Sequence, residues 1–406
     1  MKKTVVAIII LVIIILALFL IYIFGSGTEQ TPDNNANLEN PLFGPGQNVG
    51  GSGDSGGEAG TQGGGVSQEE GVVQIPRLRK IYSGEVSGYG LFDKSGTTTI
   101  RFIDRESGNI FETTSDSLDI LRITNTTILR TINSFWYNQD NVVMIYIDNN
   151  DELRFFSAEI LPKEEGREFS EVVGDFFVED IYDISINEQG SGFILVKNDS
   201  GSIGAIISPG SVETKTVFST PFQEITATQI NKSSVLINTK PSAKSTGYAY
   251  TLNTSTGLLE KVIGGSFGFF SIMSPETKEV VYSKNLGTGI SLWYYDGEES
   301  RQLSKQTLAE KCVWAEAPFI YCAVSKNSSG RDLPDLWYKG TVSFSDDIWK
   351  IDTQTNEATL LVSPESEVGE SIDASQIKIS DDQIILSFVN KIDGSLWAFL
   401  LEQKEN

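Results

Sequence analysis

The sequence predicts an all-β protein, a seven-bladed β-propeller that follows an N-terminal transmembrane helix and a disordered linker. Three observations lead to this prediction. From Val73 onward, apolar and β-branched runs of four to seven residues alternate with turns of Gly, Asn, Asp and Ser, which is typical of strands. An apolar residue that ends a strand before a small polar turn recurs seven times. The two ends of this region also complement each other.

The recurring residue marks the end of the first strand in each repeat, and a second apolar run follows every turn. Successive positions are 44, 50, 44, 43, 41 and 65 residues apart, mostly within the range of propeller repeats. A third strand then carries a further apolar or aromatic residue, as in Leu292-Trp293-Tyr294 and Ile348-Trp349. The seven positions are Phe92, Trp136, Ile186, Ile230, Met273, Trp314 and Ile379.

The chain ends predict how the ring closes. The last repeat stops after its third strand, near Leu400-Leu401-Glu402, whereas an apolar segment, Leu78-Arg79-Lys80-Ile81-Tyr82, is left over before the first repeat. Placed as the outer strand of blade seven, this segment completes the ring and covers an exposed sheet edge. A β-sandwich or two small β domains would explain neither the seven-fold period nor the complementary ends.

The N-terminal region predicts a membrane anchor. After a stub of residues 1–3 that holds Lys2 and Lys3, residues 4–24 carry no charge, and as a helix they would span roughly 30 Å, the thickness of a bilayer core. The uncharged run is longer than the core of a cleaved signal peptide. The two lysines place the N-terminus in the cytoplasm and the bulk of the chain outside it. Residues 25–75 lack Lys and Arg and are rich in Gly, Asn and Ser, which predicts a disordered linker before the propeller of residues 76–406.

Composition excludes several classes of function. A net charge of −23 repels phosphate backbones, so we expect no nucleic-acid partner. The absence of histidine removes Ser-His-Asp and Cys-His catalysis and histidine-bound metals, and two cysteines are too few for a four-cysteine metal site. We therefore expect no cofactor.

Several segments resemble WD40-like and TolB-type propellers. The turn Met273-Ser274-Pro275-Glu276 is similar to the turn after the first strand in those families, and Ile348-Trp349-Lys350-Ile351-Asp352 is similar to their third strand. The Gly-His and Trp-Asp pairs of the full WD40 signature are missing. Over most of residues 76–406 the chain resembles single-anchor bacterial envelope propeller proteins, notably at 123–128, at the two cysteines and at 333–340. This resemblance implies a fold and an envelope location, but no activity.

Blade six carries the most distinctive residues. Cys312 and Cys322 lie on the two arms of a predicted hairpin, and outside the cytoplasm a disulfide is favoured over a redox or metal pair. A long segment then separates the second and third strands. It is either a binding loop, in which aromatic residues grip a sugar or peptide, or a structural element that plugs the end of the propeller channel or adds a hairpin to the blade edge. The candidate binding residues are Arg331, Asp332, Asp335, Trp337, Tyr338 and Lys339.

Carboxylates offer weaker candidates. Asp148 and Asp151 have oxygen ligands suited to calcium but lack the full EF-hand spacing, and a polar turn is the commoner explanation for such a segment. Glu298-Glu299 and Asp381-Asp382 are either solvated turns or members of hydrolytic pairs.

We therefore expect a membrane-anchored extracytoplasmic scaffold that binds an envelope protein, a peptide or a glycan. It would touch the plasma membrane only through its single N-terminal helix. The alternatives are a hydrolase that uses acidic residues on the propeller face and a purely structural component of an envelope assembly.

Overall fold

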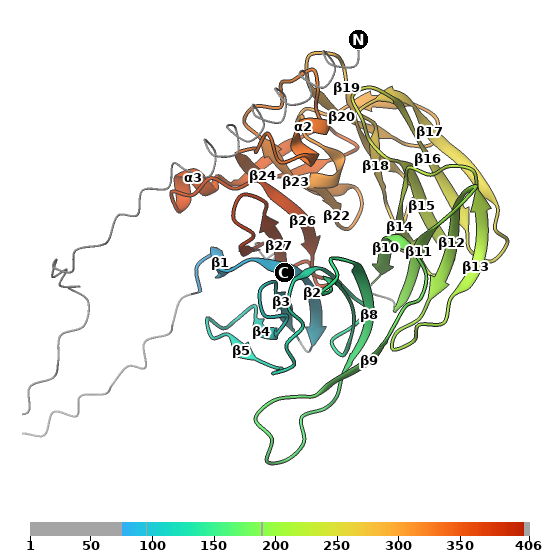
Figure 1. Ribbon diagram of the computed structural model, residues 1–406. Coiled ribbons are helices and arrows are strands. Elements are labelled where there is room, and N and C mark those ends of the chain that lie inside the picture. The colour runs from blue at the N-terminus through green and yellow to red at the C-terminus, as the bar shows by residue number, and fades with distance from the viewer. Residues whose placement is uncertain (1–74, 95, 188–189, 402–406) are drawn as a thin grey trace, which may run out of the picture. The chain divides into compact units, whose positions relative to one another are not determined.

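The computed structural model describes residues 75–94, 96–187 and 190–401, and these form seven four-stranded antiparallel sheets arranged as the blades of a propeller (Figure 1). The prediction of a seven-bladed propeller is confirmed. The predicted transmembrane helix at 4–24 lies outside the described residues, and so does the predicted linker at 25–75 except for its last residue. Within the described ranges, no helix is long and apolar enough to cross a membrane.

Each blade uses consecutive strands, named here from the inner strand to the outer one. Blade one contains β2 (Val86–Lys94), β3 (Thr97–Asp104), β4 (Ile110–Thr114) and β5 (Leu121–Arg122). Blade two contains β6 (Thr131–Trp136), β7 (Asn141–Ile147), β8 (Leu153–Ile160) and β9 (Val172–Phe176). Blade three contains β10 (Ile181–Asn187), β11 (Ser191–Asn198), β12 (Gly201–Ile207) and β13 (Lys215–Thr220). Blade four contains β14 (Ile225–Asn231), β15 (Ser234–Thr239), β16 (Thr246–Asn253) and β17 (Leu259–Phe267).

The remaining blades follow the same order. Blade five contains β18 (Phe270–Met273), β19 (Val280–Asn285), β20 (Ile290–Tyr295) and β21 (Ser300–Gln302). Blade six contains β22 (Cys312–Trp314), β23 (Phe319–Ser325), β24 (Asp346–Asp352) and β25 (Ala358–Val362). Blade seven contains β26 (Ala374–Ile379), β27 (Ile385–Asn390) and β28 (Leu396–Leu400). Within the described part of the chain, three short helices lie between strands: η1 (Ala309–Lys311), α2 (Asp335–Tyr338) and α3 (Pro364–Glu367).

Blade seven is completed from the other end of the propeller sequence. Strand β1 (Leu78–Tyr82) pairs antiparallel with β28, and Leu78 lies opposite Phe399. The order β26-β27-β28-β1 confirms the closure predicted from the leftover apolar segment. Leu78 packs into the core between blades six and seven, and Ile81 packs into the core between blades seven and one. One strand therefore joins three blades.

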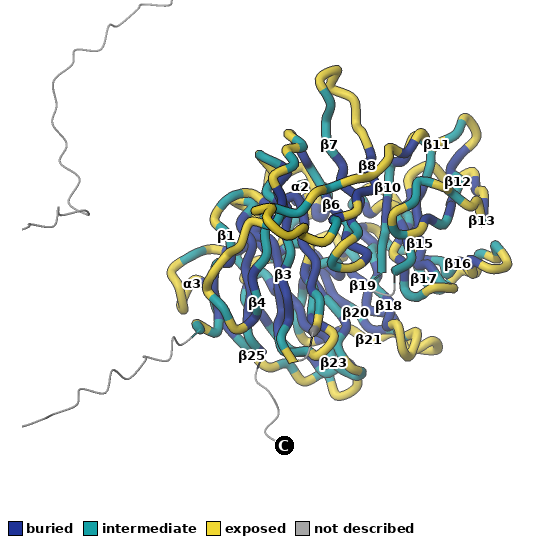
Figure 2. The backbone as a smooth tube through the Cα atoms, turned by 90° about the horizontal axis from the view of Figure 1, so that it is seen from below, coloured by how far each residue is buried: buried dark blue, intermediate teal, exposed yellow. Residues whose placement is uncertain are grey.

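The core lies between the blades rather than within any one of them. Second strands are covered on both sides by neighbouring blades, so Phe193, Ile194 and Leu195 of β11 are fully buried in a row. The outer strand β9 is largely exposed, and Figure 2 shows the same contrast between buried strand interiors and exposed connections. A continuous apolar run thus marks a second strand, which explains why the repeat could be recognised in the sequence.

Strand direction divides the connections between two faces of the ring. Turns between second and third strands open on the same face as the connections from each outer strand to the next inner strand. We name this the insertion face because it carries the long segment of blade six. Its second-to-third-strand turns are 105–109, 148–152, 199–200, 240–245, 286–289, 326–345 and 391–395.

Candidate binding face

The insertion of blade six is a packed structure that contains the short helix α2. Residues 326–345 separate β23 from β24, whereas the equivalent turn of blade five is only 286–289. The indole of Trp337 is 4% exposed and stacks on Phe344, with ring centroids 6.2 Å apart. Together with Leu333, Leu308 and Ile290 these rings form a small core of their own. The aromatic residues therefore fix the insertion to the ring.

Polar contacts attach α2 to blades on either side. The Asp335 carboxylate accepts hydrogen bonds from the Ser242 hydroxyl at 3.0 Å and the Ala243 backbone N–H at 2.5 Å, both in blade four. The Trp337 Nε1–H donates to the carboxylate of Asp373, at the entry to blade seven, at 2.9 and 3.0 Å. The insertion thus holds together residues from four consecutive blades.

The six candidate binding residues separate into two groups. Trp337 is buried and Asp335 is half-buried with its carboxylate occupied, so both serve to position the insertion. Arg331, Asp332, Tyr338 and Lys339 remain exposed. The burial of Trp337 favours the plug over aromatic capture of a ligand by that side chain, and leaves the exposed four as the part open to a partner.

Tyr338 is 40% exposed, but its hydroxyl donates to Glu310 of η1. Burial raises the pKa of the Glu310 carboxyl to about 7, against the opposing effects of the Tyr338 hydrogen bond and of nearby Lys311 and Lys391. The contact joins α2 to η1, the short helix that directly precedes β22.

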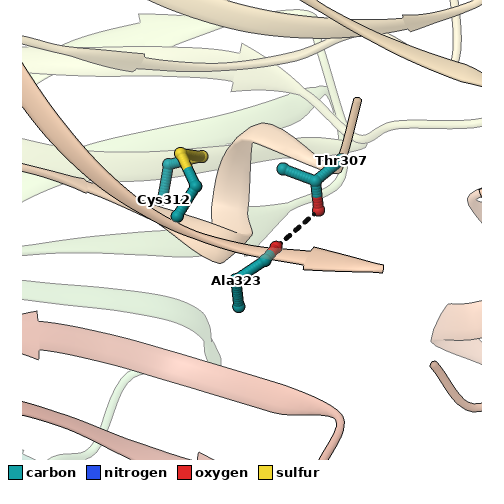
Figure 3. Close-up of a disulfide and its surroundings, with 4 residues drawn as sticks. Thr307, Cys312 and Ala323 are labelled. Carbon is teal, nitrogen blue, oxygen red and sulfur yellow. Dashed lines mark hydrogen bonds between the residues drawn. A yellow bond between two sulfur atoms is a disulfide. The ribbon is translucent and has the colours of Figure 1, made fainter. Parts of the chain in front are cut away.

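The structure contains the predicted disulfide between Cys312 and Cys322 (Figure 3). The two residues lie directly opposite each other in the β22–β23 register. Beside the disulfide, the Thr307 hydroxyl donates to the Ala323 carbonyl at 2.7 Å. The disulfide joins β22 and β23, the first two strands of the blade that carries the insertion.

The calcium candidates are occupied by protein groups. Asp148 accepts hydrogen bonds from the backbone N–H groups of Asn150 and Glu152 and from the Arg154 side chain, and these contacts lower its pKa. Asp151 pairs with Arg130 at 2.6 Å. Among the described residues, no group of three or more acidic or cysteine side chains is arranged to hold a metal.

The paired acidic residues also have structural contacts. Asp382 lies in the turn between β26 and β27, where its carboxylate accepts from Ser380 and from the Ile384 N–H. Its own N–H donates to Asp93 of blade one at 2.7 Å. Asp296 accepts from the N–H groups of Glu298 and Glu299, which makes that segment a polar turn.

An apolar cleft on the insertion face was not anticipated from the sequence. It lies where the connection from β5 to β6 meets the insertion-face end of blade two. The rings of Phe156 and Phe176 approach to 4.9 Å, and Tyr146 lies 6.3 Å from Phe176. Phe176 and Leu129 are 51% and 61% exposed.

The rim of this cleft is acidic. Of the charged residues that line it, Glu106 and Asp148 carry carboxylates and Arg130 carries a guanidinium group, which gives a net charge of −1.

Exposed apolar side chains gather on the same face. Of the sixteen large apolar residues that are exposed among the described residues, ten lie in insertion-face connections or at adjoining strand ends. Single exposed apolar residues are ordinary, but this unequal division between two faces marks one of them for contact. The ten are Leu129, Leu153, Phe176, Val178, Phe222, Phe267, Leu286, Tyr338, Val368 and Ile392.

The exposed group had only a weak sequence signal. Leu129 and Val178 directly follow the apolar residues Ile128 and Phe177, so neither stands out in the sequence. Tyr146, Phe156 and Phe176 come from three separate strands. Their proximity follows from strand register, with Phe156 opposite Phe176, and no single segment reveals it.

Comparison with solved structures identifies the fold, but neither a family nor an activity. An oligogalacturonate lyase from Vibrio parahaemolyticus is similar at a TM-score of 0.53 and 8% identity, over 81% of this chain and 94% of that one. The tricorn protease is similar at 0.50 and 11% identity, over 82% of this chain but only 35% of that one, so this chain spans about a third of its length. The Cps50 (Swd1) β-propeller domain of Myceliophteria thermophila gives 0.48 and 9% identity, over 80% of this chain and all of that one. No family model matches the chain, and no curated protein matches it.

Proposed function

We propose that this protein is a single-anchor envelope propeller that binds an extended basic, aromatic-bearing peptide segment of another envelope protein. Residues 4–24 would hold it in the plasma membrane and 25–75 would space the propeller away from the bilayer, as the uncharged run and the Gly-rich segment suggest. The observation that carries the proposal is the apolar cleft between blades one and two.

The cleft supports a peptide rather than a small glycan. It combines clustered aromatic rings with exposed Leu129, and such a surface gains free energy by covering apolar side chains. The free edge of β9 ends beside it at Phe176, which offers backbone groups to an added strand. The acidic rim selects lysine and arginine in the partner and disfavours acidic segments.

The test uses the full chain in nanodiscs of phosphatidylcholine and a short fluorescent peptide that alternates phenylalanine and lysine. We expect binding by fluorescence anisotropy, and no binding of matched peptides that alternate phenylalanine with glutamate or serine with lysine. Leu129→Ser should weaken binding about tenfold, which corresponds to about 1.4 kcal/mol.

The matched control is Leu258→Ser on the opposite face, because Leu258 is 56% exposed and Leu129 is 61% exposed. The control should bind like the unchanged protein. Equal weakening by both variants, or equal binding of the glutamate peptide, would overturn the proposal.

A hydrolytic function lacks an accessible carboxylate pair among the residues discussed. Asp346 and Asp373 approach the same lysine, but their side chains are completely buried and no substrate reaches them. The printed activities of the similar structures belong to those proteins, and at 8% and 11% identity they support only the shared fold.

A further inference from the structure

A lysine amine and two carboxylates are sealed beneath the insertion. Lys311 ends η1, Asp346 begins β24 and Asp373 precedes β26, and all three side chains have 0% relative exposure. Lys311 Nζ lies 2.7 Å from Asp346 Oδ2 and 2.5 Å from Asp373 Oδ1. The Trp337 and Phe344 ring centroids lie 5.2 and 5.0 Å from the same nitrogen.

From this arrangement we propose that Lys311 and Asp346 condense spontaneously into an intramolecular isopeptide bond, with Asp373 as the general base. This inference is independent of the proposed peptide-binding function.

The two carboxylates differ in their hydrogen bonds, and this difference assigns their roles. Asp373 accepts from the Trp337 indole N–H and from the Phe344 backbone N–H at 3.0 Å, so its negative charge is stabilised. Asp346 Oδ2 accepts from the Ala374 N–H at 2.8 Å, but Asp346 Oδ1 is buried and has no hydrogen-bond partner among the described residues. Asp346 is therefore the carboxyl that is more easily held as the neutral acid.

The electrostatics of the site agree with this assignment. Burial raises the pKa of Asp346 to about 6, with Lys311 opposing the rise and Asp373 adding to it. A neutral acid beside a neutral amine is the reactive combination, because an ionised carboxylate resists attack and an ammonium group has no free electron pair. The Trp337 and Phe344 rings enclose the pair and keep bulk water away from it.

The reaction balances without any co-reactant. The Lys311 ammonium first passes one proton to Asp346, which gives an amine and a carboxylic acid. The Nζ lone pair then attacks Asp346 Cγ while Asp373 accepts the second proton from the nitrogen. Asp373 returns that proton to the departing hydroxyl, one C–N bond replaces one C–O bond, and one water molecule leaves. Asp373 is unchanged at the end.

The fold supplies the driving force for a step that free amino acids do not take in water. Holding the groups in contact replaces a bimolecular encounter by an intramolecular one, which in well-oriented systems is worth effective molarities of about 10⁵ M or more. The product amide is uncharged, so the cost of keeping the Lys311–Asp346 ion pair out of water is removed. The bond would join the start of blade six to the strand that follows the insertion.

Peptide mapping of the full chain distinguishes the two acceptors. After reduction and trypsin digestion, acylated Lys311 resists cleavage, so residues 306–326 stay together. Asp346 falls in the tryptic peptide 340–350, whereas Asp373 falls in 351–378. We expect 306–326 joined to 340–350, lighter than the sum of the two by one water molecule.

Variants separate the chemistry from folding. Asp346→Asn keeps an electrophilic carbonyl and should still give the joined peptide, with loss of ammonia in place of water. Lys311→Met preserves the length of the side chain and should abolish the joined peptide. Asp373→Asn removes the base and should slow its appearance at least tenfold after synthesis, while unchanged circular dichroism reports an intact propeller.

Separate peptides ending at Lys311 and spanning 340–350 in the unchanged protein would overturn the proposal. A joined 306–326 and 351–378 would overturn the assignment of the acceptor. Formation at an unchanged rate in Asp373→Asn would overturn the role of the base.

Discussion

Strand β1 is the element whose loss should cost this propeller most, and the double variant Leu78→Ala/Ile81→Ala measures it. Leu78 is 3% exposed and Ile81 is 7% exposed, in two separate cores on either side of blade seven. Truncation of one buried Leu or Ile to Ala costs about 2–5 kcal/mol. Because the two sites share no core, their costs add to at least about 4 kcal/mol. A domain is stable by only about 5–15 kcal/mol, so most of the margin should disappear.

Urea unfolding of the full chain in nanodiscs, followed by tryptophan fluorescence, gives the required free energy. Trp397 on the neighbouring strand β28 is 1% exposed and reports the separation of β1. The control is Lys80→Ala on the same strand, since Lys80 makes a half-exposed ion pair with Glu370 that should contribute about 0–1 kcal/mol. A double variant that unfolds within about 1 kcal/mol of the unchanged protein would show that β1 does not close the ring.

Three further predictions concern single contacts. Cys312→Ser/Cys322→Ser should lower the free energy of unfolding by about 2–3 kcal/mol, seen as a lower melting temperature that reducing agent does not lower further. Trp337→Phe keeps the packed ring but removes the hydrogen bond to Asp373, and urea unfolding should show a loss of about 1.5–3 kcal/mol. Burial raises the pKa of Asp183 to about 6, so stability should fall as pH rises from about 4 through 6, and melting curves of Asp183→Asn should lack that part of the slope.

The Asp183 prediction depends on its sign. The folded protein holds the proton more tightly than the unfolded chain, whose ordinary value is 3.8, so the stabilisation is complete below that pH and lost above about 6. The Ala227 and Ile184 backbone N–H groups and the positive charge of Lys240 all act in the opposite direction to burial. A variant with the same pH profile as the unchanged protein would contradict this reading of the site.

The sequence predicted the strands, their order and the closure of the ring. It did not predict the side-chain contacts between segments that are distant in the chain. Six of the seven blades are built from consecutive strands, so their apolar runs and turns appear in order along the chain, and the repetition made the pattern recognisable. Ring closure was also predictable, because Leu78–Tyr82 had no other place in the repeat. The position of the insertion followed from a single enlarged spacing.

The surroundings of the insertion were not predictable in the same way. Trp337 is buried because Asp373 from the next blade accepts its indole N–H, and Asp335 is held by blade four. Lys311 lies beside a cysteine in the sequence, and nothing there shows that carboxylates from two later segments enclose it. Such contacts are set by the rotation from blade to blade, which residue spacing alone does not encode.

Blade six carries both the insertion and the Cys312–Cys322 disulfide. Its second and third strands are joined by 20 residues, 326–345, whereas blade five needs four, 286–289. On loop-closure entropy, (3/2)RT ln(20/4), the longer connection costs about 1.4 kcal/mol. The Cys312–Cys322 bond contributes about 2–3 kcal/mol in the same blade, enough to offset that cost. The disulfide therefore offsets the cost of the insertion within the blade that carries it.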